Sequence, residues 1–437
     1  MCGLSSKLLS QRPVAAPQRQ VTSLLARGGN FDAMRLVAAS AVILGHSLIT
    51  TGAAQHPLFH TCAIAAVETF FIISGYLVTQ SFVYSRSWAR FVLARSLRIF
   101  PALLGCILLS ALLLGPALTK LSLADYFRDQ KLFQFVIYNS LLENDLFMSL
   151  PGVMFHPFKK GTIINGSLWT LALEFTFYAI VLIFGVLRRL NGRSAAVLLA
   201  LTLFSLTFHV LSGYTWFLSY FAAGMLMFFV RKRQRLNGWV AWLAVPAVLL
   251  GSYGLIPWAL IPPLGAYFII YVAVDAPFQI KNATRFGDLS YGIYLYGWPC
   301  QGLAAHMLGG QPPWWQIFLL ALPSAAALAC LSWHAVERPA LRWKDADLSG
   351  LRQRIGLAAV IAYSSAAIFF GIGFKLFGFG CLLPAALALI GGQTLFWVDK
   401  AGLTARLWFG SRNLAATAEG VRPSSASSVA PASVRPQ

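Results

Sequence analysis

The segment NFDAMRLVAASAVILGH (Asn30–His46) has the pattern of a single membrane-crossing helix that carries charge. Asp32 and Arg35 stand at its start, and His46 follows Arg35 by 46 − 35 = 11 positions within an apolar run. At about 100° and 1.5 Å per residue, Arg35 and His46 project within about 20° of each other, roughly 16 Å apart along the axis. Asp32 shares this face, because it precedes Arg35 by three positions.

The position of His46 makes it a candidate functional residue. An ionisable side chain inside a membrane helix is costly, so it marks a functional site by default. The alternative is that the imidazole only forms a hydrogen bond with a neighbouring helix. The face that His46 shares with Arg35 favours the functional interpretation.

The composition predicts an all-α polytopic membrane protein. Of the 437 residues, 58% are hydrophobic and 11% are charged, whereas soluble domains carry about 25% charged residues. Apolar runs close to the roughly 20 residues needed to cross a bilayer recur along the chain. We expect a core of about ten transmembrane helices within residues 30–341.

The regions outside this core differ in character. Residues 1–29 are polar and basic, which predicts a flexible cytoplasmic arm. Apolar runs at about 355–374 and 381–398 predict two appended membrane helices within residues 342–410. Residues 411–437 are rich in Ser, Ala and Pro, which predicts a disordered cytoplasmic tail.

The formal net charge of +20 does not indicate nucleic-acid binding. The Lys and Arg residues cluster in short loops between apolar runs, which is the positive-inside pattern of cytoplasmic loops. This pattern predicts that both termini lie in the cytoplasm. The six cysteines lack metal-ligand spacing and fall mostly in apolar runs, so we predict neither a metal site nor a disulfide framework.

The second predicted helix contains the polar residues of ETFFIISGYL. Glu68 lies inside or at the outer edge of its apolar run. Ser74 and Gly75 form a small pair that would let another helix approach closely. We interpret these three residues as positions for helix packing or along a substrate path.

The basic segment ARSLRIFP brings Arg95 and Arg98 onto one helical face at the cytoplasmic end, since they are three residues apart. Two guanidinium groups on one face suit a phosphate or pyrophosphate, because their planar donor forks bind oxyanions bidentately. The alternative is that they only set topology or contact lipid headgroups. The residues alone leave both interpretations open.

Two later segments carry further candidates. NGSLWTLALEFTFY places Glu174 at or inside the outer end of the fourth helix, five residues after Trp169. A carboxylate there is costly unless it has a partner. The segment DLSYGIYLYGWP begins another helix and contains Tyr291. We interpret Trp169 and Tyr291, like Asp32, as packing or substrate-path residues.

Taken in order, these segments resemble the acyltransferase-3 family, the bacterial transmembrane O-acyltransferases that modify glycans. FDAMR…GH is similar to the family's Arg-x10-His motif, FFIISGYL to its Phe-Phe-x-x-Ser-Gly-Phe-Leu signature, and ARSLRIFP to its Arg-x-x-Arg motif. NGSLWTLALEFTFY, LSYGIYLYGWP and ERP resemble its later motifs, and the resemblance covers about residues 30–341. Two positions depart from the family pattern: Gly297 stands where many members carry a second His, and Phe175 where a second acidic residue is common.

The resemblance implies an enzyme of the bacterial inner membrane. It would move an acyl group, with acetyl as the expected one, from cytoplasmic acyl-CoA to a hydroxyl of a cell-surface glycan or of its lipid-linked precursor. The glycan classes that the resemblance implies are lipopolysaccharide and exopolysaccharide. The expected partners are acyl-CoA, the saccharide acceptor and membrane lipid, with no permanently bound cofactor.

The candidate residues can be assigned roles in such a reaction. Arg35, Arg95 and Arg98 at the cytoplasmic end would bind the donor's phosphates. His46 would take a proton from the sugar hydroxyl, a task that suits an imidazole with an ordinary pKa near 6.5. Glu174 would orient the imidazole or bind the acceptor. We therefore expect the arginines and His46 to line one water-accessible shaft at different depths.

Two other classes of protein would also place charged residues inside a helical bundle. One is a transporter or flippase for a glycan or lipid, which would be expected to contain inverted internal repeats; we find none in the sequence. The other is a non-catalytic component of a polysaccharide-assembly complex.

Overall fold

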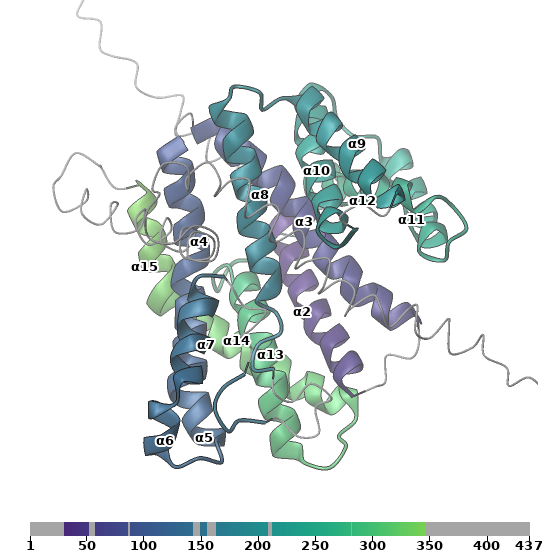
Figure 1. The fold of residues 1–437 in the computed structure, drawn as a ribbon. Helices are drawn as coiled ribbons and strands as arrows, with labels where there is room; N and C mark the ends of the chain where they lie inside the picture. The colour runs from purple at the N-terminus through teal and green to yellow at the C-terminus, as the bar shows by residue number, and fades with distance from the viewer. Residues whose placement is uncertain are drawn as a thin grey trace, which may run out of the picture.

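The computed structural model describes residues 30–51, 57–85, 88–142, 149–154, 163–208, 212–280 and 282–345. Within these ranges the chain is helical and contains no strand (Figure 1), which confirms the predicted all-α class. The predicted arm at 1–29, the two appended helices within 342–410 and the tail at 411–437 lie outside the described residues, apart from the short turn at 342–345.

The main helices follow the chain in order (Figure 1). They are α2 (Phe31–Thr50), α3 (Pro57–Ser85), α4 (Trp88–Leu109), α5 (Gly115–Leu118), α6 (Leu123–Arg128), α7 (Gln130–Ser140), α8 (Trp169–Val186), α9 (Gly192–Thr207), α10 (Ser212–Arg233), α11 (Gly238–Ser252), α12 (Ile261–Ile270), α13 (Ser290–Leu308), α14 (Trp314–Ser332) and α15 (Arg338–Leu341). Three π-helical turns lengthen α4, α12 and α14, at Ser110–Leu114, Tyr271–Asp275 and Trp333–Glu337.

Six helical segments of the described chain are long and apolar enough to cross a membrane. They are Phe31–Ile49, Ala63–Ser85, Arg90–Leu118, Trp169–Val186, Trp258–Asp275 and Trp314–Leu341. The apolar helices α9 and α11 are shorter, while α10 and α13, with 22 and 19 residues, have spanning length. The protein is therefore a multi-pass membrane protein, and these ten segments agree with the predicted core of about ten helices.

Helix α13 is the most enclosed of these segments. Fifteen of its 19 residues are buried, from Ser290 to Ala305, and it contacts α2 and α14 most extensively. Two glycines allow this close packing: a Cβ atom at Gly292 would lie 2.6 Å from the Ala329 side chain, and one at Gly297 would lie 2.7 Å from that of Ile43. Because α13 faces protein rather than lipid, it can carry polar and aromatic residues at membrane depth.

Helices α3 and α10 cross through a second pair of glycines. A Cβ atom at Gly75 would lie 2.1 Å from the carbonyl oxygen of Phe221, and one at Gly224 would lie 2.1 Å from that of Ile72. Small residues that bring two backbones together are typical of membrane helix interfaces. The structure thus places Gly75 at a helix crossing.

One end of the bundle gathers basic residues. We call this the basic end of the bundle. The helices that begin there are α2, α4, α9, α11 and α13, and its loops contain or adjoin Arg188, Arg231, Arg285 and Arg338. Asn30 fastens α2 at this end, because its side chain donates to the carbonyl oxygens of Val272 at 2.7 Å and Phe278 at 3.0 Å.

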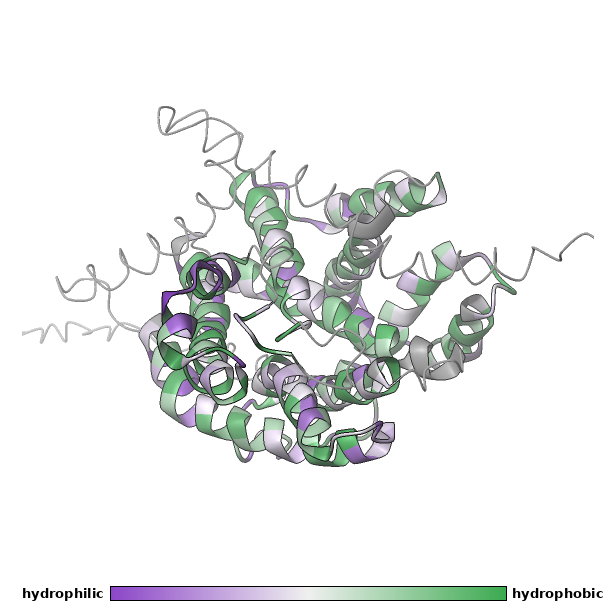
Figure 2. Ribbon diagram, turned by 60° about the horizontal axis from the view of Figure 1, so that its bottom comes forward, coloured by the Kyte–Doolittle hydropathy of each residue, from purple (hydrophilic) through white to green (hydrophobic). Residues whose placement is uncertain are grey.

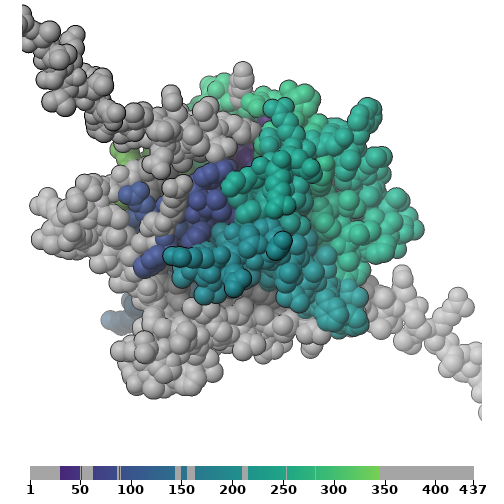
Figure 3. All heavy atoms as spheres, turned by 90° about the horizontal axis from the view of Figure 1, so that it is seen from above, coloured from purple at the N-terminus to yellow at the C-terminus, as the bar shows by residue number. Residues whose placement is uncertain are grey.

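The outer faces of several helices are apolar, as Figure 2 shows by hydropathy. Helices α9 and α11 expose large apolar side chains, among them Leu201, Phe204, Trp239 and Leu243. Such side chains suit contact with lipid. In the view from above, the teal and green helices of the described chain occupy one side of the visible face (Figure 3).

Candidate active site

A cavity lies among α2, α3, α4, α8 and α13. It encloses about 820 Å³ of empty space when its open mouth is included. One part of its wall is aliphatic and aromatic, and the other is strongly polar. The lining residues are Arg35, Val67, Phe70, Phe71, Ile73, Ser74, Leu77, Val78, Arg95, Arg98, Ile99, Thr170, Leu171, Glu174, Tyr178, Tyr291 and Tyr294.

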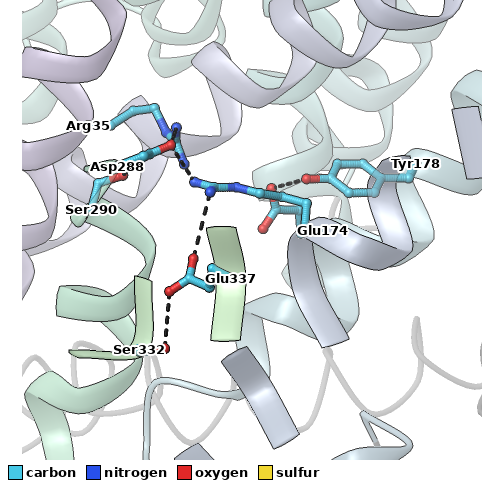
Figure 4. Close-up of polar contacts among 8 residues, drawn as sticks. Arg35, Glu174, Tyr178, Asp288, Ser290, Ser332 and Glu337 are labelled. Carbon is cyan, nitrogen blue, oxygen red and sulfur yellow. Dashed lines mark hydrogen bonds and ion pairs between the residues drawn. The ribbon is translucent and has the colours of Figure 1, made fainter. Parts of the chain in front are cut away.

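Two of the predicted arginines share one carboxylate at the basic end (Figure 4). Arg35 Nη1 lies 2.9 Å from Asp288 Oδ2, and Arg98 Nη2 lies 2.8 Å from the same oxygen. The Ser290 hydroxyl donates to the other carboxylate oxygen, Oδ1, at 2.7 Å. Asp288 therefore links α2, α4 and the start of α13 through charge-assisted hydrogen bonds.

A second carboxylate reaches Arg98 from the π-helical turn Trp333–Glu337. The Nη1 atom of Arg98 lies 3.8 Å from Glu337 Oε2, and the Ser332 hydroxyl donates to Glu337 Oε1 at 3.1 Å (Figure 4). Glu337 is only 2% exposed. A π-helical turn contains one residue more than a regular α-helical turn, so it rotates the side chains that follow it. Such turns occur often at functional sites.

The two guanidinium groups keep Asp288 ionised. Burial raises the pKa of its carboxyl, but Arg35 and Arg98, together with the Ser290 hydroxyl, outweigh that effect and hold the pKa well below its ordinary value. The carboxylate is therefore a fixed negative charge at the basic end of the cavity. Asp32 lies close enough to Arg35, Arg98 and Asp288 to interact with them electrostatically.

Arg95 differs from the other two arginines. Within the part of the chain that the structure describes, no carboxylate lies within ion-pairing distance of it. Its Nη2 atom donates to the Ser81 hydroxyl at 3.4 Å, its guanidinium carbon lies 5.8 Å from the centre of the Tyr178 ring, and its buried Nε atom has no hydrogen-bond partner. Arg95 is thus a cavity-lining cation that interacts electrostatically with Tyr178 and Glu174 but forms no ion pair at contact distance among the described residues.

Glu174 lines the same cavity and is held by two hydroxyl groups. Its Oε1 atom accepts a hydrogen bond from Ser74 at 2.9 Å and another from Tyr178 (Figure 4). Tyr178 therefore contacts both the Glu174 carboxylate and, through its ring, Arg95. This arrangement gives Ser74 a specific contact in addition to its place beside Gly75.

Tyr291 supports the arginines from α13. Its hydroxyl donates to the carbonyl oxygen of Ile99 at 2.9 Å, and its ring centre lies 5.4 Å from the guanidinium carbon of Arg98. The contact places a cation over an aromatic face, which is a favourable arrangement.

His46 is buried but does not line the cavity. The residue is 6% exposed, and its ring lies 4.8 Å from the Trp298 ring in an edge-to-face arrangement. Trp298 is fixed in turn, because its indole N–H donates to the carbonyl oxygen of Ile163 at 3.0 Å. The three arginines line this cavity and His46 is not among its lining residues, so the expected shaft common to all four residues stays a prediction.

The remaining candidates lie beside the cavity without lining it. Glu68 accepts a hydrogen bond from the indole N–H of Trp216 at 3.0 Å, and Trp169 packs against Phe217 with ring centres 5.4 Å apart. At Gly297, where many family members carry His, a side chain would run into Ile43.

Sequence reasoning missed three residues of this site: Asp288, Glu337 and Tyr178. The sequence contained a weak signal for each. Asp288 directly precedes the LSYGIYLYGWP motif, Glu337 belongs to ERP, and Tyr178 follows Glu174 by one helical turn. None of these signals identifies a partner, because the partners of Asp288 are 253 and 190 residues away.

Comparison with known proteins identifies the class of this site. A sequence profile described as an acyltransferase domain matches residues 29–334. The chain is 31% identical over 352 residues to "Nodulation protein 10" of Rhizobium leguminosarum bv. viciae, covering 72% of this chain and 93% of that protein. It is 29% identical over 349 residues to the "O-acetyl transferase" of Shigella phage Sf6, covering 73% and 98%.

The fold, the polar cavity and these matches define a multi-pass membrane enzyme that transfers acyl groups to oxygen. The chain belongs to the acyltransferase-3 family, as its motifs predicted. No solved structure matches it.

Proposed function

We propose that this enzyme transfers an acetyl group from cytoplasmic acetyl-CoA to a hydroxyl of a cell-surface glycan or of its lipid-linked precursor. It would act in the bacterial inner membrane with both termini in the cytoplasm. The observation that carries the proposal is Arg95, a cation without a carboxylate partner among the described residues, in a cavity that Arg35 and Arg98 also line. A donor that carries several phosphates needs such a group.

The basic end of the bundle supports a cytoplasmic donor side. Its Arg and Lys residues follow the positive-inside pattern. Arg35 and Arg98 keep further N–H donors after they bind Asp288, because each guanidinium has five. The donor's phosphates would therefore bind first to Arg95 and then share the remaining donors of the other two arginines, with Asp288 holding those groups in place.

The acyl carbon would then react near His46. In our proposal the imidazole accepts the proton of the acceptor hydroxyl as that oxygen attacks the thioester carbonyl. The carbon–sulfur bond breaks, the new ester bond forms, and the proton passes to the departing sulfur, so coenzyme A leaves as the thiol. The Arg35–His46 separation of about 16 Å along α2 suits the long arm that joins the phosphates to the thioester.

Support for a saccharide acceptor comes from the relatives and from the motifs. The phage relative is named an O-acetyl transferase, and the motifs resemble those of enzymes that modify glycans. Glu174, held by Ser74 and Tyr178, supplies a carboxylate that can accept hydrogen bonds from ligand hydroxyl groups.

Purified protein in sealed proteoliposomes, incubated with radiolabelled acetyl-CoA and a crude glycan fraction, tests the proposal. We expect the label to enter glycan with the wild-type protein and not with His46→Ala. Label in glycan at the wild-type rate for His46→Ala would reject His46 as the base. Movement of a glycan or lipid across the membrane without transfer of the label would instead support a transporter. If neither transfer nor movement is detected, the result would support a non-catalytic role in an assembly complex.

A further inference from the structure

The contacts between α2 and α13 show which of their residues lie at the same distance from the basic end. Both helices begin at the basic end and run in the same direction. Three pairs follow one another outward: Arg35 and Asp288, which form an ion pair; Val42 and Tyr294, which belong to one apolar cluster; and His46 and Trp298, whose rings are in contact. Val42 precedes His46 by one helical turn, just as Tyr294 precedes Trp298.

The cavity stops at the middle pair. On α13 its lining includes Tyr291 and Tyr294 but not Trp298, and on α2 it includes Arg35 but neither Val42 nor His46, among the described residues. The imidazole thus begins about one helical turn, roughly 6 Å, beyond the last lining residue of α13. Tyr294 is therefore the cavity-lining residue of α13 that lies nearest along the helix to the Trp298–His46 contact.

The Tyr294 side chain is held by one hydrogen bond between helices. The Tyr294 hydroxyl lies 2.5 Å from the Thr170 hydroxyl, which joins α13 to α8. Thr170 is itself anchored, because its hydroxyl can donate to the carbonyl oxygen of Ser167 at 3.2 Å. The Tyr294 ring packs edge-to-face against Phe70 at 5.8 Å and belongs to an apolar cluster with Val42.

We propose that Tyr294 and Thr170 form a gate between the donor cavity and His46. This inference rests on the proposed function, because a gate at this position is needed only if a donor in the cavity must reach His46. When the gate is closed, the thioester is kept away from the base and from acceptor-side water. When Tyr294 turns aside, the acyl group reaches His46. Excluding water in this way prevents hydrolysis of a reactive donor.

A single residue is well suited to this task. The Tyr294 hydroxyl is held by one neutral hydrogen bond, whose net contribution of about 0.5–1.5 kcal/mol corresponds to a roughly 2- to 12-fold change in the open population. Tyr294 lines the cavity, so its side chain has empty space beside it.

A cysteine reporter at position 46 tests the gate without requiring activity. His46→Cys protein in inverted membrane vesicles is treated with a small membrane-impermeant sulfonate-bearing methanethiosulfonate from the cytoplasmic side. Labelling is then measured by mass spectrometry on the peptide that contains residue 46. Adding Thr170→Val, which keeps the side-chain volume, should raise the labelling rate roughly 2- to 12-fold, because it removes one hydrogen bond. Adding Tyr294→Ala should raise it further.

Tyr296→Ala is the matched control, because Tyr296 is also a buried tyrosine of α13 but faces Gly105 of α4. It should leave labelling of Cys at position 46 unchanged. Equal labelling with and without Thr170→Val would show that the Tyr294–Thr170 hydrogen bond does not keep the gate closed, and would overturn the proposal. So would an equal increase in the Tyr296 control, which would indicate general loosening. Because Thr170→Val preserves shape, it carries the test even if Tyr294→Ala does not fold.

The gate and the catalytic proposal can fail separately. Labelling that responds as described, combined with full acetyl transfer by His46→Ala, would leave the gate in place and reject the role of His46. Labelling that does not respond, combined with loss of transfer in His46→Ala, would reject the gate and leave the base.

Discussion

Arg95 and Arg98 stand one helical turn apart on α4, yet the structure predicts that the same substitution will act on different properties of the protein. Arg98 pairs with Asp288 and Glu337, whereas Arg95 has no carboxylate partner among the described residues. We therefore expect Arg98→Ala chiefly to lower stability, and Arg95→Ala chiefly to lower affinity for coenzyme A.

The magnitudes follow from these contacts. Removing one partner of a buried ion pair costs about 3–5 kcal/mol. Asp288 keeps Arg35, the Arg98 and Asp288 side chains are 15% and 19% exposed, and the Arg98–Glu337 distance is a long 3.8 Å. We therefore expect a cost no larger than the lower end of this range, about 3 kcal/mol. Truncating Arg95 breaks no ion pair at contact distance among the described residues and removes only a longer-range interaction with Glu174. A hydrogen-bonded contact to a charged group contributes about 1.5–3 kcal/mol, which corresponds to a roughly 10- to 150-fold loss of coenzyme A affinity.

Two measurements separate the effects. Thermal unfolding in detergent, followed by tryptophan fluorescence, reports stability, and isothermal titration with coenzyme A reports affinity. Arg90→Ala is the control, because Arg90 is exposed on the same helix; it should change neither. If Arg95→Ala lowered the melting temperature as much as Arg98→Ala and left coenzyme A affinity intact, the distinction between the two arginines would be wrong.

Three further predictions concern other parts of the molecule. His46→Ala should abolish acetyl transfer yet bind coenzyme A within about twofold of wild type, because His46 does not line the cavity; a large loss of binding in titration would contradict this. Since the pKa of Asp288 is lowered in the folded protein, its stabilising effect is complete above the unfolded pKa of about 3.9 and is lost only as pH falls through the lower folded value. The melting-temperature difference between wild type and Asp288→Asn should therefore stay constant from pH 5 to 8, and a difference that shrinks within that range would refute the reasoning. Gly75→Ala should destabilise by about 1–3 kcal/mol through overpacking against Phe221, whereas Gly265→Ala, with 3.9 Å to its nearest neighbour, should not lower the melting temperature.

Much of the fold could be predicted because membrane helices are specified locally. Runs such as Phe31–Ile49 and Trp169–Val186 are apolar over the length of a bilayer, and basic loops between such runs indicate topology. Helical spacing also placed Arg95 and Arg98 on one face, and both line the cavity. These features depend only on residues close together in the chain.

The site could be predicted only in part, because its partners are distant in sequence. Nothing local connects Arg35 with Asp288, or Ser74 with Glu174, which are 253 and 100 positions apart. Regular helical spacing also cannot reveal the π-helical turn that carries Glu337. The prediction that Arg35 and His46 share a face rests on helical spacing within α2, whereas the position of the Tyr294 side chain depends on how α13 packs.

The long separation between Arg35 and Asp288 has a consequence for biogenesis. Helix α2 leaves the ribosome long before the segment that neutralises Arg35 has been translated, since Asp288 follows Arg35 by 253 positions. Until then the guanidinium of Arg35 must remain near the headgroups, where a long side chain can reach water. Closure of the basic end is therefore a late event, and truncated chains that stop before α13 should stay substrates for membrane quality control.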